Sequence, residues 1–253
     1  MKRDTTLLTS AVEFLVEAFS NYETRKPSFA IVHAVTSAEL VLKERLARIH
    51  PNLIFQNIDA SDFAKQQTVS LRHLPLRLLN LGVMIEPQEV RLVQQCADWR
   101  NQIVHHLPAF DPQMAEVQFP KMLDFIASFM RRELDTSIET VLPTELFRTA
   151  NLILTEWQRV LAEAQHRASN ERGVLVEACP QCGGDHVLCL SNETKVYCHL
   201  CHSHCYRLQE CVQCGRQTVS RLSPFAHDNY CDDCIEAAGD EYIQHLIDME
   251  RGK

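Results

Sequence analysis

The chain has 253 residues, of which 45% are hydrophobic and 23% charged, and its formal net charge is −8. This length allows one large domain or two modest ones, and the composition is ordinary for a globular protein. The negative charge argues against non-specific nucleic-acid binding, because counterion release needs basic side chains, so any such site must be local. Only seven glycines occur, and the leucine-rich, helix-favouring composition argues against an all-β fold.

The N-terminal apolar stretch, LLTSAVEFLVEAF, is interrupted by Glu13 and Glu17. No uninterrupted apolar run in the chain approaches membrane-spanning length. We therefore expect no signal peptide, no membrane partner and a cytoplasmic location.

Apolar residues at helical spacing, together with the positions of the prolines, predict six helices in the first part of the chain. These helices cover approximately residues 5–24, 28–50, 69–81, 87–106, 119–136 and 144–170. Pro75 should kink or break the third helix, and Pro108 and Pro112 should stop the fourth from continuing. Residues 53–67 are expected to form a loop or a short irregular element.

The character of the sequence changes after residues 169–173. The short β-type runs GVLVEA, HVLCL and KVYC are separated by pairs of cysteines. Ten of the eleven cysteines lie between Cys179 and Cys234, and only Cys96 lies elsewhere. In a cytoplasmic chain so many cysteines need an explanation other than disulfides. Their uneven distribution marks a domain boundary.

Eight of these cysteines form two units that share one pattern. In each unit a CxxC pair is followed by 15 or 16 residues and a second CxxC pair: Cys179, Cys182, Cys198 and Cys201, then Cys211, Cys214, Cys231 and Cys234. Zn²⁺ takes four soft ligands in tetrahedral geometry, and a CxxC turn presents two thiolates on one side of the ion. Gly183 and Gly215, directly after a second cysteine, suit the tight turn. We predict two structural Zn²⁺ sites.

The cysteine region resembles tandem zinc ribbons. The predicted organisation is therefore mainly α: a helical bundle over 1–170, a first ribbon over 174–208, a second over 209–236 and a short C-terminal helix over 237–253. The pairs can also bind cross-braced, first with third and second with fourth. Five further residues in this region are spare candidates for zinc ligands. Alternatively, the histidines among them are surface residues and the cysteines are small buried residues. The five are Cys189, His199, His202, His204 and Cys205.

The predicted ribbons have no open coordination position, so a structural role is expected for their zinc. Residues 171–253 carry seven Lys/Arg against thirteen Asp/Glu, a net charge of −6. An acidic polymer would bind poorly to such a region. We expect it to dock a protein partner, such as an antitoxin, or to serve as a scaffold.

The fourth predicted helix ends in RNQIVHH, in which Arg100 and His105 form an RxxxxH pattern. The chain has a second match, Arg45 to His50, so the pattern alone decides nothing. Helix 28–50 carries Glu39 in the middle of its apolar stripe, and Arg100 interrupts the stripe of its own helix in the same way. Because a buried charge is costly unless it is paired, we predict that Glu39 contacts Arg100 and orients it.

With Asn101 following Arg100, and with a proline-containing loop and another helix after it, this motif resembles that of the HEPN superfamily of all-α nucleases and their relatives. The resemblance implies a HEPN-like fold for the first domain, metal-independent cleavage of RNA, and a homodimer in which two motifs meet. His105 can act as base or acid, and Arg100 can bind phosphate oxygens. Asn101 lies one turn from His105 and can orient it or touch the substrate. His106 is expected to be a bystander.

The sequence thus predicts an endoribonuclease of toxin or phage-defence type. A non-catalytic interaction module, with helices for dimerisation and ribbons for recruitment, is the main alternative. A zinc-ribbon protein that contacts nucleic acid is a third possibility. The Glu39–Arg100 pair can also be a polar contact in the core, and His105 and His106 can simply favour the negative end of the helix dipole.

Overall fold

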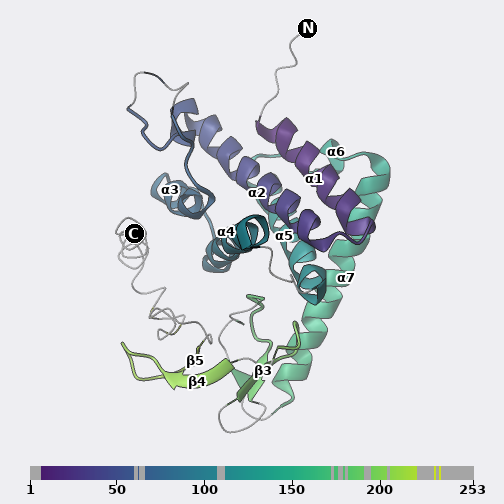
Figure 1. Ribbon diagram of the computed structural model, residues 1–253, viewed down its shortest axis with the longest axis vertical. Coiled ribbons are helices and arrows are strands. Elements are labelled where there is room, and N and C mark those ends of the chain that lie inside the picture. The colour runs from purple at the N-terminus through teal and green to yellow at the C-terminus, as the bar shows by residue number, and fades with distance from the viewer. Residues whose placement is uncertain are drawn as a thin grey trace. The chain divides into compact units, whose positions relative to one another are not determined.

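A computed structural model describes residues 7–59, 62, 66–106, 112–171, 174–175, 179, 182–190, 195–203, 206–220, 231 and 234. Within these ranges, the side chains at 102, 105, 106, 112–115, 174–175, 206–208 and 220 lie outside the description. The chain forms two compact units, Met1–Thr155 and Glu156–Lys253. The described part is mainly helical, with short strands toward the C-terminus (Figure 1), as the sequence predicted.

The helices that the structure describes include the six predicted ones in the predicted order, and most of their boundaries lie close to the predicted positions. They are α1 (Leu7–Glu23), α2 (Pro27–Ile49), α3 (Leu74–Asn80), α4 (Pro87–His106), α5 (Pro112–Glu133), α6 (Ile138–Val141) and α7 (Thr144–Ser169). Short 3-10 turns occupy Pro51–Ile54 and Leu71–His73. Several of these elements have proline in the first turn, where its missing N–H would have had no helical partner.

Prolines also explain where the prediction and the structure differ. Pro75 does not kink a helix over 69–81; it lies in the first turn of α3, directly after the 3-10 turn Leu71–His73. Helix α5 begins at Pro112 rather than near residue 119, and Pro120 lies inside it. A proline can lie either in the first turn of a helix or at a tolerated position in its interior. The local sequence does not show which of the two applies, so these helix boundaries were predicted incorrectly. The short helix α6 was not predicted.

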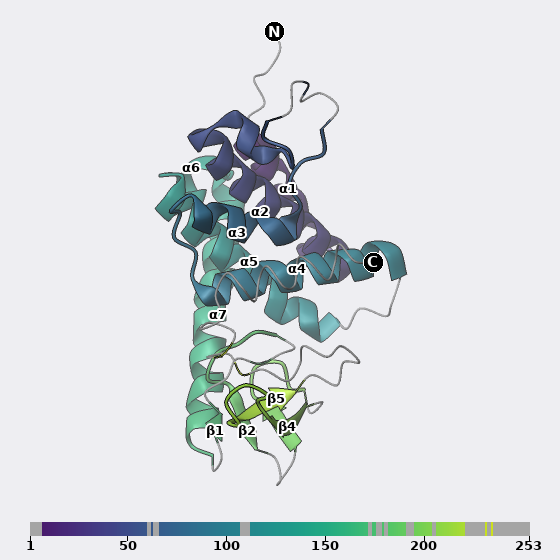
Figure 2. The same ribbon diagram turned by 90° about the vertical axis from the view of Figure 1, so that its left-hand side faces the viewer.

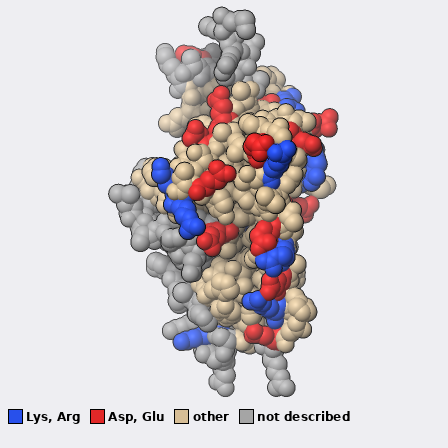
Figure 3. Space-filling view, turned by 90° about the vertical axis from the view of Figure 1, so that its right-hand side faces the viewer, with Lys and Arg blue, Asp and Glu red and all other residues tan. Residues whose placement is uncertain are grey.

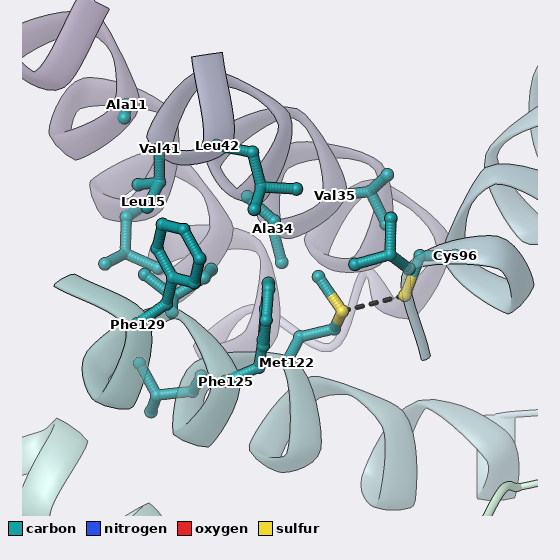
Figure 4. Close-up of a cluster of buried hydrophobic side chains, with 14 of the residues drawn as sticks. Ala11, Leu15, Ala34, Val35, Val41, Leu42, Cys96, Met122, Phe125 and Phe129 are labelled. Atoms are coloured by element: carbon teal, nitrogen blue, oxygen red, sulfur yellow. Dashed lines mark hydrogen bonds between the residues drawn. The ribbon is translucent and has the colours of Figure 1, made fainter. Parts of the chain in front are cut away.

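Helix α2 is the centre of the helical unit, where it contacts α1, α4 and α5 (Figures 1 and 2). Small residues of α2, Ala30, Ala34 and Ala38, are buried and allow close helix packing. Figure 4 shows side chains of α1, α2, α4 and α5 meeting in the apolar core of this unit. There the Cys96 thiol lies 2.8 Å from the Met122 sulfur, and burial raises the pKa of Cys96 far above its ordinary value.

The outer face of α7 carries ion pairs at helical spacing. Arg159 pairs with Glu156 and Glu163, and Arg167 also pairs with Glu163. These groups are exposed, so each pair adds little to stability. On the face drawn in Figure 3, acidic and basic side chains are interspersed, and neither sign gathers into one large patch.

The second unit contains a five-stranded antiparallel sheet in which each strand pairs with the next along the chain. Its strands are β1 (Val174–Leu175), β2 (Leu188–Leu190), β3 (Lys195–Cys198), β4 (Tyr206–Glu210) and β5 (Gln217–Ser220). The last two were not predicted. The predicted terminal helix over 237–253 lies outside the described residues.

Within the described ranges, no helix combines the length and the apolar character that crossing a membrane requires.

Candidate functional site

The eight predicted cysteine ligands form two groups of four. Cys179, Cys182, Cys198 and Cys201 make one group, and Cys211, Cys214, Cys231 and Cys234 make the other. Within each group the sulfur atoms lie within 4.8 Å of one another, close enough to share a metal ion. The pairs thus associate in chain order, and the cross-braced arrangement is not formed.

The sulfur–sulfur distances fit a tetrahedral ion. Sγ of Cys179 lies 3.8 Å from Sγ of Cys201, and Sγ of Cys182 lies 3.8 Å from Sγ of Cys198. A tetrahedron with a zinc–sulfur bond of about 2.3 Å has an edge of about 3.8 Å. A disulfide would need about 2.05 Å. The geometry is therefore compatible with four ligands around one ion and not with a disulfide.

Three of the CxxC turns have the same backbone. In each, the N–H after the second cysteine donates to the carbonyl of the first: Gly183 to Cys179 at 2.6 Å, His202 to Cys198 at 2.9 Å and Gly215 to Cys211 at 2.8 Å. All three donors have positive φ, 64°, 57° and 71°. Glycine adopts this region at little cost, and a histidine does so less readily. His202 therefore has a backbone role that the sequence prediction did not find.

Hydrogen bonds to sulfur favour the thiolate form at some of these cysteines, whereas hydrogen bonds with neighbouring thiols raise the pKa of others, such as Cys182 and Cys234. Burial by itself raises the pKa of Cys179, but bonds with the thiols of Cys182, Cys198 and Cys201 outweigh it and hold that pKa well below its ordinary value. Burial also raises the pKa of Cys211, and backbone N–H groups, including that of Cys231 at 3.3 Å, lower it overall to about 6. Thiolates are the form that binds metal.

The predicted Glu39–Arg100 contact is confirmed. Nη1 of Arg100 donates to Oε2 of Glu39 at 2.5 Å, joining α4 to α2. The Glu39 side chain is 15% exposed and that of Arg100 is 31% exposed, so the pair lies at the margin of the core with the guanidinium toward solvent.

Lys43 completes this group and was missed in the sequence. Its Nζ donates to Oε1 of Glu39 at 2.5 Å and to Oγ1 of Thr68 at 3.0 Å. The Lys43 side chain is only 8% exposed. The signal was the Glu-to-Lys spacing of four residues, which brings two side chains together on one helix face. One carboxylate thus faces two cations, and the group has a net charge of +1.

The other residues of the motif lie in the last turns of α4. Asn101 is exposed. His105 and His106 belong to the helix, but their side chains lie outside the described part. The second RxxxxH match has a structural explanation: Arg45 pairs with Glu133 at 3.2 Å, and His50 accepts a bond from the backbone N–H of Asn52.

The five spare residues separate into three cases. His204 and Cys205 lie outside the described residues. His202 is exposed and lies with Nδ1 2.7 Å from the Tyr197 hydroxyl. Cys189 and His199 lie together with Glu171 in a third group, apart from both four-cysteine groups.

In the comparisons with known proteins, no family model matches the chain, and neither a curated protein nor a solved structure matches it.

Proposed function

We propose that the protein is a metal-independent endoribonuclease whose active site is centred on Arg100 and His105. The observation that carries the proposal is the group of Glu39, Lys43 and Arg100. A lone buried carboxylate would repel phosphate, but here two cations leave a net positive charge beside an open guanidinium. Because the rest of the chain is acidic, this local charge is what an RNA phosphate would recognise.

Each residue has a chemical role in this proposal. A guanidinium has five N–H donors, so Arg100 can bond Glu39 and still bind the phosphate that gains charge during cleavage. His105 takes the proton of the ribose 2′-OH or delivers one to the leaving 5′-oxygen. Asn101, one turn before His105, positions it or contacts the substrate. Glu39 orients Arg100 and does not touch the substrate.

The reaction needs both a base and an acid, and with His106 expected to be a bystander the motif of one chain supplies only His105 for these roles. We propose that two chains form a homodimer in which their motifs meet. The HEPN resemblance, with its twofold arrangement of RxxxxH motifs, supports this dimer. The proposed setting is a toxin or phage-defence system.

The two four-cysteine groups would each hold one Zn²⁺ as a closed structural site, in tandem zinc ribbons. The sulfur–sulfur distances and the backbone N–H bonds to sulfur support this assignment. The proposed role of the ribbons is to dock a protein partner, such as an antitoxin, or to position the dimer.

A non-catalytic interaction module is the second candidate. It is favoured by the same Glu39–Arg100 contact, because a partly buried ion pair can stabilise a helix interface without any substrate. In that case the ribbons would recruit a partner, and Arg100 would have no phosphate to bind.

RNA cleavage by the zinc-loaded protein without added Mg²⁺ separates the two candidates. The nuclease proposal predicts products ending in 2′,3′-cyclic phosphate, since the 2′-oxygen attacks the adjacent phosphorus as the 5′-oxygen leaves. An RNA with 2′-deoxy residues should resist cleavage. Strong chelators must be omitted, because they would strip zinc from the ribbons. Absence of cleavage by a folded dimer across several RNA pools would favour the interaction module.

Loss of cleavage in Arg100→Ala and His105→Ala would assign the activity to the motif. If both variants, folded and dimeric, cut like the wild type, the nuclease would lie elsewhere and this site assignment would be wrong.

A further inference from the structure

A third group of ligand-type side chains lies in the second unit. Glu171 follows the end of α7, Cys189 is the middle residue of β2, and His199 directly follows β3. Their oxygen, sulfur and nitrogen atoms all lie within 4.8 Å of one another. The four-cysteine groups are already complete, so these three residues are not needed for either.

The strand register explains why this group is separate from the first four-cysteine group. Cys189 pairs with Tyr197 across β2 and β3, while Leu188 pairs with Cys198. The N–H of His199 donates to the carbonyl of Val187 at 2.9 Å and extends this ladder by one step. Because neighbouring side chains on a strand point to opposite faces, His199 lies on the face of Cys189 and Tyr197, and Cys198 on the other.

The three donor atoms converge on one point. Sγ of Cys189 lies 3.0 Å from Oε2 of Glu171 and 3.3 Å from Nε2 of His199. That same nitrogen lies 3.0 Å from Oε1 of Glu171. Tetrahedral zinc with these donors would separate them by about 3.3–3.6 Å. Small outward movements of the side chains would admit an ion.

A proton relay is the main alternative for a cysteine, a histidine and a glutamate. In a relay the histidine uses one ring nitrogen for the thiol and the other for the carboxylate. Here both partners face Nε2. The thiol is also buried, with Cys189 only 1% exposed. A buried thiol is poorly placed to attack a substrate, so convergence on one cation explains the arrangement better.

We infer that Glu171, Cys189 and His199 form a third zinc site, in which they are the three protein ligands that the described residues supply and the fourth position takes water or an anion. The mixed oxygen, sulfur and nitrogen donor set suits Zn²⁺. A dication would balance the charges of the carboxylate and the bound thiolate. The opening lies on the side of Glu171, whose side chain is 46% exposed, whereas that of His199 is 10% exposed.

The Tyr197 ring supports the histidine from the side. Its centroid lies 4.9 Å from that of His199 at an interplanar angle of 83°. The Tyr197 hydroxyl in turn contacts His202. This edge-to-face contact limits the rotation of the His199 ring and keeps Nε2 directed at the other two ligands. The open site is independent of the ribonuclease proposal.

The zinc content of the full-length protein, loaded with zinc and then desalted, tests the inference. Wild type should retain about three ions per chain by elemental analysis and native mass spectrometry, and Cys189→Ala, His199→Ala and Glu171→Ala about two. The matched control is His202→Gly, which alters a neighbouring histidine but keeps the backbone conformation that the turn requires, and it should retain about three.

Two outcomes would overturn the third site: about two ions in wild type, or about three in Glu171→Ala. Glu171 is the decisive position because it is half exposed and outside the sheet, so its loss should leave the four-cysteine groups intact. Cobalt substitution gives a second readout. The third equivalent should show d–d bands at higher energy than those of four-thiolate sites, and these bands should be missing in Glu171→Ala.

Discussion

The helical unit, Met1–Thr155, and the cysteine unit, Glu156–Lys253, are each stabilised internally by different means. The helical unit buries a continuous apolar core from α1, α2, α4 and α5. The cysteine unit has strands of two to five residues, and several of its most buried side chains are cysteines. Strands this short bury too little apolar surface to fold unaided, so we expect metal bound by the cysteine groups to supply much of this unit's stability. The two units should therefore respond differently to the same perturbation.

The largest expected difference comes from metal. Cys198→Ser should abolish zinc retention at the first group and unfold the sheet around it, since structural zinc contributes about 10 kcal/mol or more. Hydrogen exchange of residues 182–203 should become fast, while α2 and α5 stay protected. Cys96 lies in the helical unit, so Cys96→Ala is the control. This variant should retain as much zinc as the wild type. Equal loss of hydrogen-exchange protection in both units would contradict the claim that the two units are stabilised by different means.

A core truncation should have the opposite pattern. Phe129 is fully buried in α5, and Phe129→Ala should destabilise the helical unit by about 3–5 kcal/mol through lost contacts and a cavity. Denaturant unfolding followed by helical circular dichroism measures this effect, and zinc content should not change. Leu152→Ala, at a position 72% exposed, should cost less than about 0.5 kcal/mol.

The Glu39 group is the polar exception within the apolar unit. Glu39→Gln should cost about 3 kcal/mol because it leaves the buried Lys43 ammonium without its carboxylate. In a Lys43→Met background the same change should cost clearly less, which a double-mutant cycle would measure. Equal costs in the two backgrounds would show that Lys43 does not depend on Glu39.

This group also changes the expected result of a charge swap. From the sequence alone, reversing both Glu39 and Arg100 should restore the pair. In the structure, an arginine at position 39 would lie beside Lys43. The double swap should therefore recover only part of the lost stability unless Lys43 is also replaced.

The smallest effect is expected at a turn. His202 has φ of 57°, where Gly183 and Gly215 stand in the equivalent turns. His202→Gly removes backbone strain but also the contact with Tyr197, so stability should change by less than about 1 kcal/mol. His202→Val should be clearly worse, because a β-branched residue is strained at this φ. Thermal unfolding of the zinc-loaded protein would compare them.

How far the sequence predicts the structure depends on the range of the interactions involved. The helix boundaries and the cysteine groups follow from local periodicity and spacing. Glu39 and Arg100, 61 positions apart, were paired because each interrupts an apolar stripe. Lys43 was missed because a lysine at helical spacing from a glutamate usually forms an exposed pair. The grouping of Glu171 with Cys189 and His199 depends on strand register and on where α7 ends, which no local pattern specifies.

The ribonuclease proposal is tested most directly by matched alanine variants at the two RxxxxH motifs. Arg100 and Arg45 each pair with a mostly buried glutamate and are 31% and 26% exposed, so both substitutions remove a similar ion pair. Cleavage of one RNA by the zinc-loaded protein without Mg²⁺ should fall by about 100-fold or more in Arg100→Ala and His105→Ala. It should stay within a few-fold of wild type in Arg45→Ala and His50→Ala. Equal loss at both motifs, or none at either, would contradict an active site at Arg100 and His105.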